Sequence, residues 1–195
     1  MDTAEEALTK SQAARRQRVL LAALELGAQG GYEAVQMRDV ASRAGVALGT
    51  IYRYFPSKDA LLAAAMVQWM EDLERRFTER APRGDTTAER VYEVLRRAVT
   101  TMERQPQLAE AVITALTSDD REAGGASVAT TDVMNRVMLR AFPTDMDAAT
   151  KAAIAKVLGH VWFSCLITWS HGAGDLAWVA SELETASHLL CDHLG

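Results

Sequence analysis

The sequence predicts an all-α protein, and three observations support this. Apolar residues recur at spacings of three and four over most of the chain, which is the period of an amphipathic helix. No run of alternating apolar and polar residues has turn signals at both ends, so no strand is expected. Alanine is abundant and aromatic residues make up only 6% of the chain, a composition that favours helices.

Three helices are predicted ahead of residue 56. They cover 11–29, 36–44 and 47–54. Gly30–Gly31 ends the first helix, because glycine adopts the left-handed backbone common after helices. Gly45 permits a tight turn after the second, and Pro56 stops the third because the residue before proline resists helical geometry. Residues 1–10 are acidic and polar, unlike a signal peptide, and are expected to form a disordered arm.

The remainder, 57–195, is expected to form a second, larger helical domain. Its predicted helices cover 57–80, 87–104, 106–117, 126–142, 148–171 and 176–193, with a polar, loose segment over 118–125. Ser57, Thr86 or Thr87, and Asp175 are the expected N-caps. Proline and glycine between these helices supply the breaks.

The second and third helices have the layout of a helix-turn-helix, in which two short helices flank a glycine-containing turn. The second helix of that motif enters the DNA major groove with its N-terminal residues nearest the bases. Hydroxyls and arginines suit phosphates, and Ala47 and Leu48 suit thymine methyl groups. The candidate DNA-binding residues are Gln36, Met37, Arg38, Ala47, Leu48, Gly49, Thr50, Tyr52, Arg53, Tyr54 and Lys58. Lys58 stands where the helix dipole disfavours a cation, which a bound phosphate would explain.

The distribution of charge favours DNA binding over the alternative, in which the two helices are an ordinary amphipathic pair in a protein that does not bind DNA. The chain carries −5 overall, but residues 10–58 contain eight basic and three acidic residues. That segment therefore carries +5 and the remainder −10. A basic N-terminal module on an acidic body is expected of a DNA-binding protein.

These residues also carry a family resemblance. The motifs are Gly30-Gly31-Tyr32, Arg38-Asp39-Val40-Ala41, Ala44-Gly45-Val46, Gly49-Thr50-Ile51-Tyr52 and Tyr54-Phe55-Pro56-Ser57-Lys58. Together they resemble the signature of the tetracycline-repressor (TetR) family. The resemblance implies a homodimeric regulator, usually a repressor, released from operator DNA by a small ligand in its C-terminal domain. Val35, Gln36 and Ala47 stand where many members have Ser or Thr, which makes the DNA-binding face more apolar.

A closer resemblance is to the actinobacterial repressors of sterol (cholesterol) catabolism within that family. The segments GGYEAVQMR, GTIYRYFPSK and VWFSCLITW carry it. For that subgroup the implied effector is a steroid carried as a coenzyme A (CoA) thioester.

The last two predicted helices are apolar over more than one core-facing stripe, which usually means a second partner. The candidate dimer-interface residues are Leu158, Val161, Trp162, Cys165, Leu166, Trp169, Trp178, Leu183, Ala186 and Leu190. Two such helices from each subunit would form a four-helix interface and place two recognition helices about 34–36 Å apart. The alternative is that these residues close the core of one chain.

The ligand pocket is expected among methionine-rich apolar faces, because methionine adapts to bulky apolar ligands. The candidates are Met66, Trp69, Met70, Leu73, Met102, Leu108, Val112, Ile113, Leu116, Val133, Met134, Val137 and Met138. Plain core packing is the alternative for each. Five arginines are candidates for CoA phosphates or for solvated faces: Arg75, Arg76, Arg96, Arg97 and Arg104.

An enzyme is not expected. HExxH, GxSxG, GxGxxG and P-loop motifs are absent from the sequence, so neither catalytic residues nor a metal or cofactor is predicted. No apolar run is long enough to span a membrane, so a cytoplasmic protein is expected. Cys165 and Cys191 lie in apolar helical patterns and are predicted to be buried thiols rather than redox sensors. The alternative function is that of a helical ligand-binding module that does not bind DNA.

Overall fold

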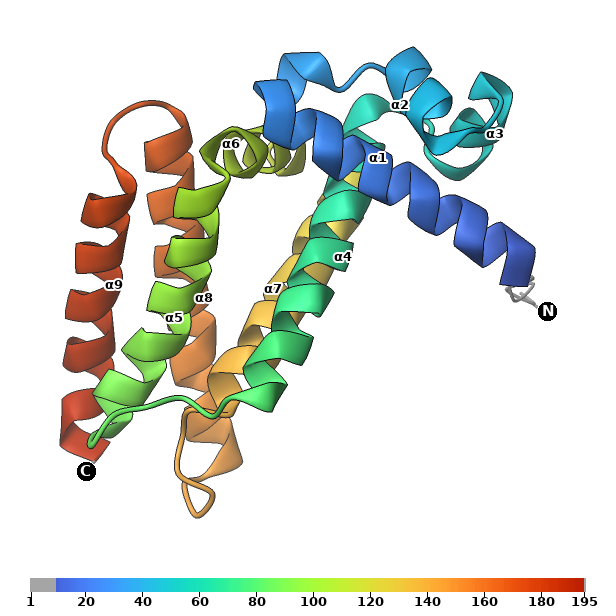
Figure 1. Ribbon diagram of the computed structural model, residues 1–195. Helices are drawn as coiled ribbons and strands as arrows, with labels where there is room; N and C mark the ends of the chain where they lie inside the picture. Colours follow the sequence, from blue (N-terminus) through green and yellow to red (C-terminus); the bar gives the residue numbers. More distant parts are fainter. Residues whose placement is uncertain (1–9, 195) are drawn as a thin grey trace.

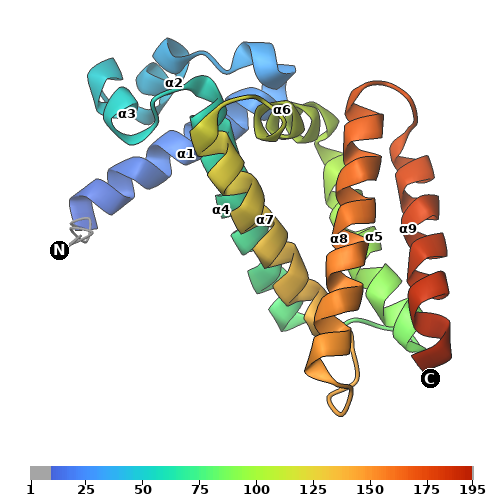
Figure 2. The same cartoon turned by 180° about the vertical axis from the view of Figure 1, so that it is seen from behind.

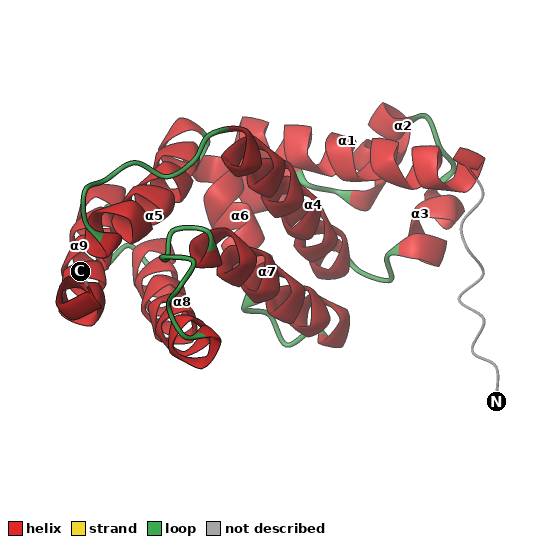
Figure 3. Ribbon diagram, turned by 90° about the horizontal axis from the view of Figure 1, so that it is seen from below, coloured by secondary structure: helices red, strands yellow, loops and turns green. Residues whose placement is uncertain are grey.

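The computed structural model describes residues 10–194. Only the backbone is described at Lys10, Leu73, Arg76, Thr78, Glu122 and Ser127. Within this range every regular element is a helix, which confirms the predicted fold class (Figure 3). The predicted arm falls outside the described residues, except for Lys10, which begins the first helix.

The helices are α1 (Lys10–Ala34), α2 (Met37–Ala44), α3 (Leu48–Tyr54), α4 (Lys58–Glu79), α5 (Thr87–Arg104), α6 (Pro106–Leu116), α7 (Arg121–Leu139), α8 (Ala148–Ser170) and α9 (Leu176–Cys191), followed by a short 3₁₀ turn over Asp192–Leu194. Besides α7, whose cap is given below, four of the described helices begin at a side-chain cap. Ser57, Thr86, Asp147 and Asp175 each accept a hydrogen bond from the amide three residues ahead. All but Asp147 were predicted as caps.

The boundaries of two helices differ from prediction by three residues or more. The first helix is kinked at Gly30–Gly31, where Gly31 has a left-handed φ of +68°, and one further turn follows to Ala34. α7 begins at Arg121, although 118–125 was predicted to be loose. The reason is a cap: Asp120 accepts a hydrogen bond from the Ala123 amide at 3.2 Å. α7 also ends at Leu139 rather than at residue 142.

The helices form a smaller head, made of α1, α2 and α3, and a larger body (Figure 1). α1 crosses α6 and also packs on α2 and α4, and α2 packs on α3. In the body α4 lies along α7, while α9 lies along both α5 and α8. Figure 2 shows α7 and α8 meeting at their lower ends and diverging toward α6. α4 therefore belongs to the body but begins at the head.

α8 is long and apolar enough to cross a membrane by length and composition alone. In this fold it packs against α7 and α9, and Leu158 and Leu166 are buried. Only 28% of its apolar window is buried within the chain, so packing against α7 and α9 accounts for part of its composition.

Both cysteines are buried, as predicted. Burial raises the pKa of Cys191 to about 11 and also raises the pKa of Cys165. Since the thiolate is the reactive form, both thiols are expected to be inert at neutral pH.

Replacing Thr86 with alanine is expected to lower the free energy of unfolding by about 1 kcal/mol. Thr86 accepts from the Glu89 amide, and the Glu89 carboxylate accepts from the amides of Thr86 and Asp85. These hydrogen bonds lower the pKa of Glu89. The contribution of the Glu89 carboxylate to the free energy of unfolding is therefore present above the pKa of the unfolded chain, and it is lost as pH falls through the pKa of the folded chain. Urea denaturation at one protein concentration measures the change. Thr114→Ala on exposed α6 surface is the control, and equal losses in both variants would contradict a capping role.

Candidate DNA-binding surface and effector pocket

Buried apolar residues fix the angle between α2 and α3. Val40, Ala41 and Ile51 are buried between the two helices and α1. Gly45 ends α2 with φ +65°, and the Val46 amide donates to the Ala41 carbonyl at 3.0 Å. This tight turn gives the predicted helix-turn-helix and leaves one face of α3 uncovered.

More than half of the predicted DNA-binding residues are exposed. Six are exposed: Gln36, Arg38, Ala47, Gly49, Tyr52 and Arg53. Thr50 is half-buried. The predicted contacts Met37, Leu48 and Tyr54 instead pack partly against the core. Leu48 lies one turn from Ile51 on the same side of α3, so it helps to seat the helix. The polar residues between these anchors therefore form the outward surface.

Several basic residues of the head also stabilise it. The Arg18 Nε donates to the Ala44 carbonyl at 3.2 Å and so satisfies the end of α2. The Arg16 guanidinium lies 5.3 Å from the centroid of the Phe55 ring, and Arg43 pairs with Glu25 at 3.5 Å. The positive charge counted from the sequence thus serves packing as well as the surface.

Lys58 contacts the protein itself. Its Nζ donates to the Tyr32 carbonyl at 3.1 Å and lies 3.6 Å from the centroid of the Tyr32 ring. The Tyr32 hydroxyl donates to Asp59 at 2.6 Å. Burial, aided by this hydrogen bond, raises the pKa of Tyr32 to about 12, so the hydroxyl stays a donor. This cluster ties the end of α1 to the start of α4, and a DNA phosphate must compete with Tyr32 for Lys58.

A second contact joins the head to the body. The Ser57 hydroxyl caps α4 by accepting from the Ala60 amide and donates to Asp120 Oδ2 at 2.6 Å. Asp120 caps α7 through its other carboxylate oxygen. The N-termini of α4 and α7 are therefore joined by two capping side chains, a link that the sequence did not predict.

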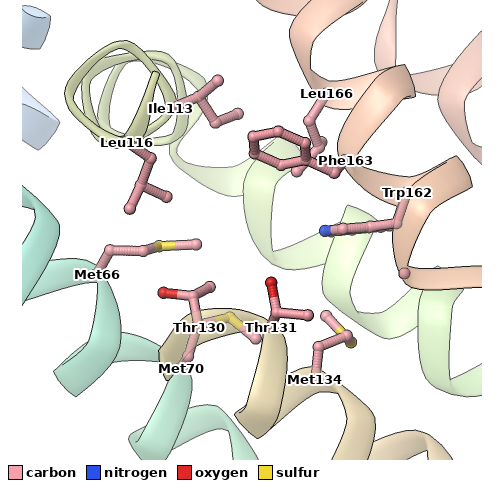
Figure 4. A pocket seen from close by; sticks show the side chains of 11 residues that line it. Met66, Met70, Ile113, Leu116, Thr130, Thr131, Met134, Trp162, Phe163 and Leu166 are labelled. Carbon is pink, nitrogen blue, oxygen red and sulfur yellow. The ribbon is translucent and has the colours of Figure 1, made fainter. Parts of the chain in front are cut away.

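An apolar pocket lies where α4, α6, α7 and α8 meet (Figure 4). Five of the predicted pocket residues line it: Met66, Met70, Ile113, Leu116 and Met134. Its volume is about 40 Å³, which is room for roughly three water molecules at 10–15 Å³ each. An acyl chain or a steroid must therefore widen it.

Six other residues complete the wall: Thr130, Thr131, Gly159, Trp162, Phe163 and Leu166. Trp162 and Leu166 had been assigned to the dimer interface, and the other four were missed. Gly159 was a usable signal, because a glycine inside a long apolar helix leaves room beside it. The Thr130 Oγ1 is buried without a hydrogen-bond partner in the described part of the chain. It offers a ligand one polar contact in an apolar cavity.

The remaining predicted pocket residues do not line this cavity. Trp69 is half-buried against the core, and the Leu73 side chain lies outside the described residues. The others are buried in helix packing: Met102, Leu108, Val112, Val133, Val137 and Met138. They are core residues, because one face of each helix must pack on its neighbour.

The predicted interface residues separate in a similar way. Leu158, Cys165, Leu166 and Leu183 are buried within one chain, so a second copy cannot reach them. Five others, Val161, Trp169, Trp178, Ala186 and Leu190, are half-buried. The large apolar side chains left exposed on α8 and α9 are Val157, Phe163 and Leu189.

The chain matches two family descriptions. Residues 19–65 match bacterial regulatory proteins of the tetR family, and residues 84–190 match the tetracyclin repressor-like C-terminal domain. The HTH-type transcriptional repressor KstR of Rhodococcus jostii (strain RHA1) is 38% identical over 182 residues, 93% of this chain and 85% of the relative. The crystal structure of a TetR transcriptional regulator from Rhodococcus sp. RHA1 shares 31% identity with a TM-score of 0.81, covering 93% of this chain and 97% of that one.

The fold is also that of Thermus thermophilus FadR, a TetR-family repressor crystallised in complex with lauroyl-CoA. That structure has a TM-score of 0.65 and 24% identity, and the match covers 90% of this chain and 92% of that one. The two family matches lie on the helix-turn-helix and on the helices that enclose the pocket. The family and its relatives are regulators rather than enzymes, and this chain belongs to the TetR family of DNA-binding transcriptional repressors.

Proposed function

We propose that this protein represses genes of lipid or steroid degradation and is released from a palindromic operator by a bulky acyl-CoA thioester. The observation that carries the proposal is the apolar pocket against α4, the helix that begins at the DNA-binding head. Two likenesses favour this effector class: the sequence resemblance to sterol-catabolism repressors, and the shared fold of a repressor holding lauroyl-CoA.

Release follows from the small size of the pocket. An effector that enters it must separate α8 from α4 and α7, because these helices form its walls. Ser57 and Asp120 join the N-termini of α4 and α7, so the two helices are expected to move together. A tilt of α4 then shifts the head that precedes it. The effector lowers DNA affinity because it binds the widened, DNA-free state better.

The repressor is proposed to act as a cytoplasmic homodimer through the outer faces of α8 and α9. Exposed apolar groups on one surface favour a partner, and Leu189 is 78% exposed. Phe163 is partly exposed and also lines the pocket, so the interface and the pocket share a residue. A two-fold pair of heads fits a palindromic site with half-sites one DNA turn apart.

The test is a genome-wide DNA-binding selection with purified protein at fixed salt, followed by binding with and without lauroyl-CoA and a steroid acyl-CoA. We expect a palindrome near lipid- or steroid-degradation genes, released by at least one thioester. If a clear site is found but no thioester releases the protein from it, the proposal of a repressor stands and the acyl-CoA effector class is rejected. If no sequence-selective site is found, the better interpretation is a helical ligand-binding module that does not bind DNA.

A further inference from the structure

A second hollow, open to solvent, lies between the end of α4 and the length of α5. Its volume is about 400 Å³, far larger than that of the apolar pocket. We call it the arginine cleft, because its lining includes Arg80, Arg96, Arg97 and Arg104. Phe77, Glu93, Thr100 and Thr101 complete the wall.

The arginine cleft carries more positive charge than its acidic neighbours offset. Arg97 pairs with Glu93 and donates to the Arg80 carbonyl at 2.8 Å, which fastens the end of α4 to α5. Arg96 pairs with Glu103 at 3.1 Å and donates to Thr100 at 2.8 Å.

Arg80 and Arg104 are different. Among the described side chains neither has an acidic partner, and both are exposed. Guanidinium groups bind phosphate oxygens through two parallel hydrogen bonds, and the cleft adds threonine hydroxyls as further donors. A free fatty acid offers one carboxylate, which pairs with one guanidinium group, whereas a diphosphate has enough oxygens to pair with two.

The arginine cleft and the apolar pocket share one stripe of α4. Met66 and Met70 line the pocket, and Phe77 lines the cleft. Met70 and Phe77 are seven residues apart, which places them on the same side of the helix and about 10 Å apart along its axis. The pantetheine arm between the thioester and the diphosphate of CoA can span such a distance.

We propose that the arginine cleft binds phosphate groups, which in the proposed effector are those of its CoA part. In this form the inference rests on the proposed function. The acyl or steroid group then occupies the apolar pocket, and Arg80 and Arg104 hold the phosphates. A free phosphorylated nucleotide offers the same chemistry and is the other source of the ligand.

The test compares two double variants of the full chain by calorimetry. Arg80→Ala with Arg104→Ala removes the two unpaired cations. Arg83→Ala with Arg121→Ala removes two exposed arginines that do not line the cleft and serves as the matched control. Each protein is titrated with lauroyl-CoA, a steroid acyl-CoA, lauric acid, free CoA and ATP. Operator affinity is measured beside these titrations to show that each variant is folded.

We expect the cleft variant to bind a CoA thioester about a hundredfold more weakly, roughly tenfold for each lost charged contact. Its affinity for lauric acid and for the operator should not change, and the control should behave as wild type. Equal thioester affinity in all three proteins would overturn the cleft as the phosphate site while leaving the proposed effector in place. Binding of free CoA or ATP that depends on Arg80 and Arg104, without DNA release by any thioester, would support the cleft and reject the proposed effector. Failure of wild type to bind any phosphate compound would overturn the inference.

Discussion

Replacing Gly49 with glutamate is expected to weaken operator binding about a hundredfold or more without harming the fold. Gly49 is the second residue of α3 and is exposed, and a Cβ added there meets nothing within 4 Å. A carboxylate near a helix N-terminus is favourable, and glycine is a poor helix former, so thermal stability should not fall. The same carboxylate faces the DNA phosphates. A lost contact costs about 1–3 kcal/mol, and a dimer suffers the loss twice.

The matched control for that substitution is Ala149→Glu. Ala149 is exposed and is also the second residue of its helix, α8, but it lies at the far end of the body from the head (Figure 1). Both variants add one negative charge, so a general effect of net charge would appear in both. Fluorescence anisotropy with a labelled operator at fixed salt measures the difference. If Gly49→Glu binds like the control, α3 does not face the DNA.

Much of the head could be predicted because its signals are local. Gly45 fixes the turn, Pro56 stops α3 and Ser57 caps α4, and each acts within a few residues of its position. The seating of α3 was less predictable. Leu48 and Tyr54 were assigned to the DNA surface, but a seven-residue helix needs more apolar anchors than Ile51 alone.

The start of α7 was predicted wrongly for a physical reason. Gly124 and Gly125 disfavour a helix by intrinsic propensity, so the sequence indicated a loop. The Asp120 cap and packing of α7 along α4 outweigh that preference. The cap is linked to Ser57, 63 residues earlier, and no local pattern predicts such a contact.

The sequence also could not predict which residues of α8 face the core, the pocket or the solvent. Its side chains are apolar on nearly all sides, so periodicity gives no preferred face. The fold assigns Leu158 to the core, Trp162 to the pocket and Val157 to the surface. Since α7 and α9 both pack on α8, only the arrangement of three helices separates these roles.

Gly159→Leu is expected to leave operator affinity unchanged and to raise the thioester concentration needed for release at least about tenfold. Gly159 lines the apolar pocket, and among the described residues the neighbour of an added Cβ within 4 Å is the Asn135 Oδ1, at 3.7 Å. A leucine side chain at this lining position is expected to occupy much of a space of about 40 Å³. Replacing a glycine inside a helix also removes a cost of about 1 kcal/mol, so the fold should tolerate the change.

Gly159→Ala is the matched control, because one methyl group leaves most of the pocket open and should preserve release. Anisotropy of operator-bound protein, titrated with lauroyl-CoA and a steroid acyl-CoA, compares the three proteins. Release of Gly159→Leu at wild-type thioester concentrations would place the effector elsewhere. A loss of operator affinity without effector would mean that the leucine separates α8 from α4 as an effector does. That result would support the coupling of pocket width to DNA release, while contradicting the expectation that the DNA-bound pocket accommodates leucine. Whether operator affinity falls in the absence of effector therefore distinguishes a blocked pocket from a widened one.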